Sequence, residues 1–320
     1  MDIPPTLDAS ISTAHTVKSV LLLVNPISGK GDTRSKRKNL VRFIECCAAN
    51  GITVTRVDTS RANHCYETLL TYPLELVDCV CVAGGDGTYR ESVAGMLART
   101  DKLVVPITVL PLGSGNNLAR DCGINSYKDT LAKLREGRRK RVDALQVAHR
   151  DGTDVSVNVV TWGIGLAVGK TAETRLRWLG PLKYDVATLW HILWNLKRRA
   201  RLFPRVDGKG NQVDMDFHLM LAQNTRRMGN GYLSCPSSQL DDGKMDLAVI
   251  PHLPRLSMLK LFMQLKGDGA HVLDKRVQYI QVDQLNLETE ESEEVNIDGD
   301  RMVWTPITID VLPNSWEVLV

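Results

Sequence analysis

The chain has 320 residues, of which 43% are hydrophobic, and a formal net charge of +3. A charge so close to balance excludes the broad basic surface typical of nucleic-acid-binding proteins, so we expect no nucleic-acid partner. The length predicts two domains, at about 150 residues per domain. Seven cysteines without a Cys-x-x-Cys spacing are typical of reduced thiols in a cytoplasmic protein. No apolar run reaches the ~18 residues that a membrane span needs.

Strand and helix patterns alternate along the first part of the chain, after a flexible lead-in at residues 1–17. This alternation predicts an α/β nucleotide-binding domain at residues 18–141, with a doubly wound parallel sheet and helices on both faces. Ligands bind at the carboxyl ends of the strands in such sheets. The predicted strands are 20–24, 52–57, 77–83 and 104–110, and the predicted helices are 35–50, 62–72, 89–98, 118–122 and 127–136.

Short strand-like runs separated by turn signals replace this pattern after Arg141. They predict a second, mainly antiparallel β-sandwich domain at residues 142–303. One longer helical segment, at about 180–199, interrupts them, and residues 304–320 could return to the first sheet. The predicted strands are 142–148, 155–161, 215–223, 245–250 and 277–287.

Three predicted strands of the first domain run directly into glycine-rich segments that precede helices. The segments are Asn-Pro-Ile-Ser-Gly-Lys-Gly at 25–31, Gly-Gly-Asp-Gly-Thr at 84–88 and Pro-Leu-Gly-Ser-Gly-Asn-Asn at 111–117. Glycine has no Cβ, so a phosphate chain can lie directly against backbone amides. All three segments fall at the carboxyl ends of strands, which predicts a nucleotide site.

Asp86 is the single carboxylate among the glycines of the second segment. Phosphoryl transfer depends mainly on positioning and charge neutralisation. One acid could therefore serve there, either by accepting a hydroxyl proton or by holding Mg²⁺ through water. Glu91 follows five residues later, in the first turns of the predicted helix, and could reach the same site. The alternative for this segment is a plain β-turn with an exposed aspartate.

Other motifs allow more than one interpretation. Residues 29–31 lack the spacing of a P-loop, which disfavours a Walker-type NTPase. The Asp298-Gly-Asp300 turn is a hairpin signal, and it could also bring two carboxylates to a cleft between the domains. The turn ending at Asp246 likewise favours a hairpin, with a cation site as the alternative interpretation.

A tryptophan-bearing segment precedes the basic residues 197–201. It allows two interpretations: a helix packed on a core with a solvated basic end, or contact with an anionic membrane surface, to which tryptophan and arginine together are suited. Its large apolar residues are Trp178, Leu182, Trp190, Leu193 and Trp194.

In this order, the motifs resemble the lipid kinase family that includes diacylglycerol, sphingosine and ceramide kinases, over residues 18–320. Residues 59–64 and 175–185 are most similar to the sphingosine and ceramide kinase branch. The resemblance implies an NAD kinase-like nucleotide domain, ATP with Mg²⁺, and phosphorylation of the primary hydroxyl of a lipid that enters the second domain. It also implies that Asp86 is the general base or organises Mg²⁺, and that Asp298 and Asp300 complete the catalytic site. The nucleotide-binding residues that it implies are Asn25, Ser28, Gly29, Thr59, Gly85, Gly87, Thr88, Glu91, Gly113, Ser114, Asn116, Arg177 and Lys183.

Two departures from the family pattern bear on the substrate and the site. The family commonly ends Asp-Gly-Glu, whereas this chain has the shorter Asp300. Sphingosine kinases carry an acid after Trp-Gly to hold the lipid amine, whereas residues 162–168 are uncharged here. Ceramide or diacylglycerol is therefore as consistent with the chain as a free sphingoid base. We expect a cytoplasmic lipid kinase that associates peripherally with membranes. An NAD kinase-like enzyme and a non-catalytic nucleotide-binding membrane adaptor are the alternatives.

Overall fold

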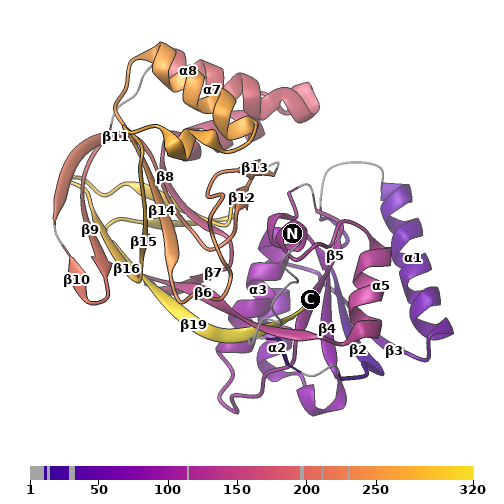
Figure 1. The fold of residues 1–320 in the computed structure, drawn as a ribbon. Helices are drawn as coiled ribbons and strands as arrows, with labels where there is room; N and C mark the ends of the chain where they lie inside the picture. Colours follow the sequence, from indigo (N-terminus) through magenta and orange to yellow (C-terminus); the bar gives the residue numbers. More distant parts are fainter. Residues whose placement is uncertain are drawn as a thin grey trace, which may run out of the picture. The chain divides into compact units, whose positions relative to one another are not determined.

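The structure is a computed structural model that describes residues 11–12, 15–28, 33–113, 115–194, 198–210, 212–229 and 231–320. The chain divides into two compact units, Met1–Asp143 with Asn314–Val320, and Ala144–Pro313. Each unit is described by itself below (Figure 1). Within the described ranges, no helix is both long and apolar enough to cross a membrane.

A parallel sheet forms the centre of the first unit, with the strand order β3-β2-β4-β5-β19. Its last strand comes from the far end of the sequence, where Val318 pairs with Ile107. Strand β6 (Arg139–His149) pairs with β19, and β1 (Ile11–Ser12) pairs with β6. The parallel strands are β2 (Ser19–Val24), β3 (Thr53–Asp58), β4 (Cys79–Gly84), β5 (Ile107–Pro111) and β19 (Ile307–Leu319).

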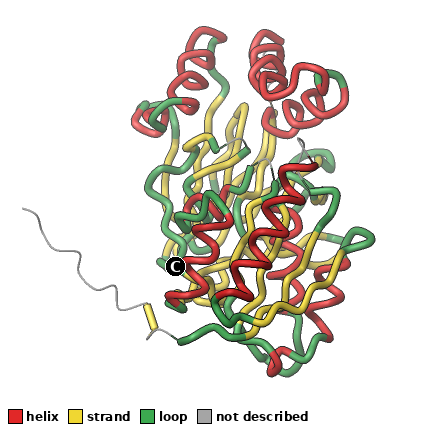
Figure 2. The backbone as a smooth tube through the Cα atoms, turned by 90° about the vertical axis from the view of Figure 1, so that its right-hand side faces the viewer, coloured by secondary structure: helices red, strands yellow, loops and turns green. Residues whose placement is uncertain are grey.

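Helices cover both faces of this sheet (Figure 2). Every residue of β4 is buried, as expected for a strand covered on both sides. One face packs its Cys79 and Cys81 with Phe43 of α1, and β19 adds Trp316, whose ring contacts Tyr89 edge-on at 5.7 Å. The doubly wound α/β fold is therefore confirmed. The helices are α1 (Thr33–Ala49), α2 (His64–Thr71), α3 (Asp86–Leu97), α4 (Asn117–Asp121) and α5 (Tyr127–Glu136), with a 3₁₀ turn η1 at Leu74–Leu76.

The second unit is a β-sandwich, which confirms the predicted class. Trp162 and Phe217 meet edge-on at 5.1 Å inside its main core. Its longer strands are β7 (Gly152–Ser156), β8 (Val159–Gly163), β9 (Arg198–Val206), β11 (Val213–Gln223), β14 (Met245–Pro251), β15 (Gln278–Val282), β16 (Gln284–Glu288), β17 (Glu294–Ile297) and β18 (Arg301–Trp304). Short strands β10 (Lys209–Gly210), β12 (Arg227–Met228) and β13 (Tyr232–Leu233) complete it.

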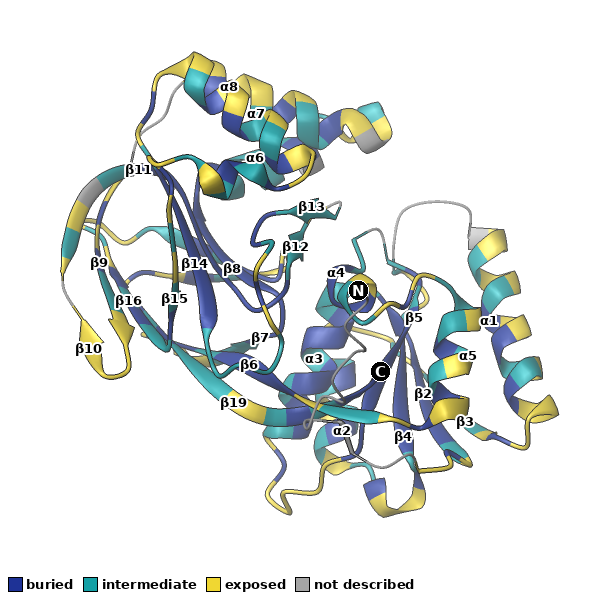
Figure 3. Cartoon of the chain, viewed as in Figure 1, coloured by how far each residue is buried: buried dark blue, intermediate teal, exposed yellow. Residues whose placement is uncertain are grey.

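Helices α6 (Ile164–Thr174), α7 (Lys183–Trp194) and α8 (Arg255–Lys266) lie on the outside of this sandwich (Figure 3). They contribute Ile164, Ile192 and Leu261 to a second apolar cluster with β8, β11 and β14. Two 3₁₀ segments accompany them, η2 (Arg177–Leu182) before α7 and η3 (Ala270–Leu273) after α8.

Several predicted elements of the second unit were wrong in extent. The predicted helix 180–199 ends at Trp194, and residues 198–206 form β9. Buried Ala200 and Leu202 alternate there with exposed Arg199 and Arg201, which is a strand period that the run of basic residues concealed. The predicted strands 155–161 and 277–287 are each divided in two, and helices α6 and α8 were not predicted.

Candidate nucleotide site

The loops that follow β2, β4 and β5 meet at the carboxyl edge of the first sheet. The Asn25 backbone N–H donates to the carbonyl of Ala83 at 3.0 Å, and its side-chain amide donates to Thr88 Oγ1 at 2.9 Å. The Gly113 N–H donates to the carbonyl of Gly84 at 3.1 Å. The sequence-predicted glycine junctions therefore lie together, tied to one another by hydrogen bonds.

Glycine is required where these loops touch. A Cβ built on Gly113 would lie 2.5 Å from the Cα of Gly85, closer than real Cβ atoms approach backbone. A Cβ on Gly84 would lie 2.7 Å from that of Thr88. At Gly113 backbone thus packs directly on backbone, and the missing side chains leave room for a phosphate chain to approach these loops.

Asp86 begins α3, directly after the N-cap residue Gly85, and is half-buried. Its carboxylate accepts two hydrogen bonds from one residue. The Asn117 backbone N–H donates to Oδ1 at 2.9 Å, and the Asn117 side-chain amide donates to Oδ2 at 3.3 Å. Asn117 is 6% exposed, so this contact holds the acid in a fixed orientation. Sequence reasoning did not select Asn117, although the doubled asparagine that ends the third glycine segment was a signal for it.

Asn116 closes the third loop on itself. It adopts a left-handed conformation, with φ of 52°. Its Oδ1 accepts the Gly113 N–H at 3.0 Å, and its Nδ2 donates to the Gly113 carbonyl at 2.9 Å. Asn116 thus shapes the glycine loop, and its contact with a nucleotide stays a prediction.

Three further predicted ligands lie at the same edge. Thr59 follows β3 and donates its N–H to the Val24 carbonyl at 2.8 Å. Ser28 follows β2, and its carbonyl accepts from Nζ of Lys36 at 3.1 Å. Gly87 lies in the first turn of α3. Two other predicted ligands, Gly29 and Ser114, lie outside the described residues.

Glu91 has a partner within the first unit. Its Oε1 accepts the backbone N–H of Asn63 at 2.9 Å. Asn63 is the left-handed N-cap residue of α2. In this arrangement, Glu91 ties α3 to the start of α2.

Asp298 is buried and supports a bend in the second unit. Its carboxylate accepts the Ser156 hydroxyl at 2.7 Å and the N–H groups of residues 157, 158 and 159 at 2.9, 3.0 and 2.8 Å. Four donors of this kind stabilise an ionised carboxylate. They also fix the bend between β7 and β8, whereas Asp300, two residues later, is exposed.

The two predicted basic ligands also lie in the second unit. Arg177 is exposed in η2. Lys183 is buried at the start of α7, with Nζ 4.7 Å from the centre of the Tyr184 ring.

A metal site was predicted at Asp86 and, separately, at Asp246. Asp246 is fully buried on β14, and burial raises the pKa of its carboxyl, while the hydroxyls of Tyr279 and Ser238 lower it in part. Among the residues described, no three His, Cys, Asp or Glu side chains cluster to hold a metal. Mg²⁺ keeps several waters and needs only one or two carboxylates when it binds with substrate phosphates, so the single Asp86 fits such an ion.

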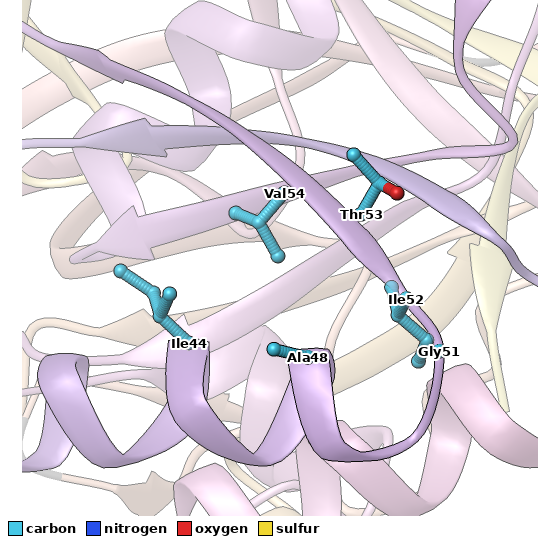
Figure 4. Close-up of a pocket in the computed structure, with 6 residues that line it drawn as sticks. All are labelled: Ile44, Ala48, Gly51, Ile52, Thr53 and Val54. Carbon is cyan, nitrogen blue, oxygen red and sulfur yellow. The ribbon is translucent and has the colours of Figure 1, made fainter.

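A small apolar pocket of about 390 Å³ lies elsewhere, between α1 and β3 (Figure 4). Its lining residues include Thr53 and Val54, at the amino end of β3. Ligands of parallel sheets bind at the opposite, carboxyl end. The pocket is therefore separate from the glycine loops.

A doubly wound unit with glycine loops at its carboxyl edge, followed by a β-sandwich, defines a class of two-domain nucleotide-dependent kinases. Comparison with known proteins gives the family. Residues 19–147 match the diacylglycerol kinase catalytic domain, and residues 158–320 match the YegS C-terminal NAD kinase beta sandwich-like domain. The chain belongs to this family of lipid kinases, as the resemblance implied, and membership of a kinase family implies the use of ATP.

Relatives of several kinds are similar to this chain. A diacylglycerol kinase of Mycobacterium tuberculosis is 26% identical over 309 residues, covering 95% of this chain and 96% of its own. A sphingosine kinase 2 of Arabidopsis thaliana is 24% identical, covering 85% and 65%. The crystal structure of a putative diacylglycerol kinase from Bacillus anthracis has the same fold, with a TM-score of 0.77 at 21% identity, covering 95% of this chain and 98% of its own.

Proposed function

We propose that this lipid kinase transfers a phosphoryl group from ATP to the primary hydroxyl of a sphingolipid, with Mg²⁺ bound near Asp86. The observation that carries the proposal is the fixed carboxylate of Asp86 at the point where three glycine loops meet. Mg²⁺, when bound, would neutralise the charge of the phosphates.

The residues of the first unit have separable roles in this proposal. The glycine loops around Gly85 and Gly113 bind the phosphate chain. Asp86 accepts the proton of the lipid hydroxyl at a carboxylate oxygen, or would hold Mg²⁺ through water, while Asn117 keeps its carboxylate in place. Asn25 and Thr88 hold the first loop against α3, so the cradle is formed before ATP arrives.

The start of α6 favours a neutral acceptor within the sphingolipids. Trp162 is fully buried, and its indole N–H donates to Glu293 at 3.1 Å. Residues 163–168 that follow carry no charge, so this segment offers no acid for a lipid amine. We therefore rank ceramide above a free sphingoid base. Diacylglycerol is the second candidate, since the Mycobacterium tuberculosis diacylglycerol kinase aligns over 95% of the chain.

A substrate panel tests the proposal. The purified chain is incubated with radiolabelled ATP, Mg²⁺ and, separately, ceramide, sphingosine, diacylglycerol or NAD in detergent micelles. We expect label in ceramide, reduced to background in the Asp86→Asn variant and by removal of Mg²⁺ with EDTA. Label in diacylglycerol alone would establish the second candidate, and label in NAD or in no acceptor would contradict the proposal.

A further inference from the structure

Helix α7 exposes only apolar side chains. All five of its exposed residues are apolar, namely Val186, Leu189, Trp190, Leu193 and Trp194. They recur at helical spacing and so occupy one face. The opposite face packs inward, where Ile192 is buried and His191 Nε2 hydrogen-bonds to Thr171 Oγ1 of α6 at 2.8 Å. A surface helix normally has the reverse pattern, and an exposed apolar face of this kind marks an interaction site.

Helix α8 adds a second apolar strip beside it. Leu256, Leu259 and Met263 are exposed at i, i+3 and i+7, and Leu256 is 82% exposed. The two helices lie side by side in the second unit (Figure 1), joined by an ion pair between Lys266 and Asp185 at 2.7 Å. The segment before α7 contributes Trp178, which is 78% exposed. We call the exposed apolar residues of η2, α7 and α8 the apolar face.

The exposed charges that the structure describes within η2, α7 and α8 are of one sign, although the exposed Asp268 follows the end of α8 by two residues. Every exposed charged side chain described in η2, α7 and α8 is cationic: Arg177, Arg255, Lys260 and Lys266. The acid of α7, Asp185, is half-buried and already bonded to Lys266 and to the Tyr232 hydroxyl. Tryptophan and leucine beside lysine and arginine, with no exposed acid among them, complement an anionic bilayer surface.

We propose that the apolar face docks the kinase on the anionic membrane that contains its lipid acceptor, with Trp190 and Trp194 inserted among the headgroups. The proposal rests on the proposed function for the presence of a lipid acceptor. The two indole rings stack at 4.5 Å and lie at the exposed end of α7, where their amphipathic rings suit the headgroup level. The flanking cations bind lipid headgroups, so attachment weakens as salt rises.

Co-sedimentation with vesicles tests docking without catalysis. The full chain is mixed with phosphatidylcholine vesicles containing one third phosphatidylserine, and with pure phosphatidylcholine vesicles. We expect the Trp190→Ser/Trp194→Ser variant to lose at least tenfold in partitioning to anionic vesicles, and Arg255→Glu/Lys260→Glu to lose at least as much. Leu76→Ser, which removes an exposed leucine from the first unit, is the matched control and should bind as the wild type. Blue-shifted tryptophan fluorescence on binding reports insertion, and the shift should be smaller in the tryptophan variant, which keeps Trp178.

The outcomes separate docking from the proposed function. Unchanged vesicle binding by the tryptophan variant would overturn the docking proposal, as would a wild-type dimer in light scattering that the variant dissociates. Equal rates of the variant and wild type on acceptor in detergent micelles, with a tenfold lower rate of the variant on vesicles, would support it. If no lipid is phosphorylated while binding still depends on the apolar face, the proposed function fails and docking stands.

Discussion

Asn117 donates both its backbone N–H and its side-chain amide to the carboxylate of Asp86. The two residues are 31 positions apart and follow different strands of the sheet. This contact joins the second glycine loop to the third. It gives the proposed catalytic acid an orientation that its own loop does not supply.

Replacing Asp86 tests the proposed catalytic acid. Asp86→Asn should lower kcat by at least about 10³-fold, because the amide can neither accept the hydroxyl proton nor neutralise charge at the metal. Circular dichroism and the melting temperature should stay near wild type. Asp58→Asn, which removes an exposed acid at the end of β3, is the control and should keep its activity. Near-normal turnover by Asp86→Asn would contradict the catalytic role proposed for Asp86.

Asn117 should affect the rate more than the binding of ATP. Asn117→Ala frees the carboxylate of Asp86 to rotate, so we expect kcat to fall about 10- to 100-fold with a smaller change in the KM for ATP. Asn116→Ala instead loosens the loop at Gly113 and should mainly raise that KM. The same kcat-to-KM pattern in both variants would show that Asn117 has no separate positioning role.

The contact between Gly85 and Gly113 should tolerate no side chain. Gly113→Ala would force the two loops apart, and we expect a loss of about 2 kcal/mol in unfolding free energy together with weaker ATP binding. Gly169→Ala is the contrasting variant, since its Cβ would enter open space in α6 and should leave stability equal or raise it by up to ~1 kcal/mol. Urea unfolding and nucleotide-binding calorimetry measure both effects.

Asp298 and Asp300 should differ in their effect on stability. Asp298→Asn leaves buried N–H donors without their anionic acceptor and should destabilise the second unit by about 3 kcal/mol. Asp300→Asn changes an exposed position, so its unfolding free energy should stay within about 0.5 kcal/mol of the wild-type value. Activity assays on folded protein at low temperature then test the predicted catalytic role of each acid. Full activity in both variants would limit Asp298 to support of the bend.

Asp78 should make the first unit sensitive to acid. Its carboxylate accepts the N–H groups of Lys18 and Ser19 and the Ser19 hydroxyl at 2.8–2.9 Å. Partial burial raises the pKa of Asp78, but these hydrogen bonds outweigh burial, and the net pKa is lowered. Its stabilisation is therefore present above the unfolded pKa of about 3.9 and is lost as pH falls through the lower folded value.

The variant Asp78→Asn measures that contribution. We expect this variant to lose ~2 kcal/mol of unfolding free energy at pH 7. Its difference in unfolding free energy from the wild type should shrink below about pH 4. Glu75→Gln, at an exposed position in η1, is the control and should show no such convergence. A difference in unfolding free energy that stays constant down to pH 2 would contradict the stabilising role of the Asp78 carboxylate.

The sequence by itself was sufficient to predict the α/β unit and the strand ends at which its glycine segments lie. Local signals carry that information, because an apolar run that ends in glycine marks a strand end regardless of distant contacts. Strand β4 and the start of α3 show this directly, since the predicted strand 77–83 and glycine segment 84–88 became a buried strand and a helix N-terminus. The helix predicted over residues 180–199 was wrong at its end, where β9 begins, because basic residues concealed the two-residue period of a strand.

Only the tertiary structure decided which groups the polar side chains contact. The pairing of Asp86 with Asn117 depends on β4 and β5 lying side by side, and the four donors to Asp298 come from residues about 140 positions away. The same holds for the apolar face. Tryptophan and leucine in α7 fit a buried helix as well as an exposed one, and the structure alone shows which side of α7 packs against α6 and which side remains exposed. A pattern of residue types records the period of a helix, whereas burial depends on what the rest of the chain places against it.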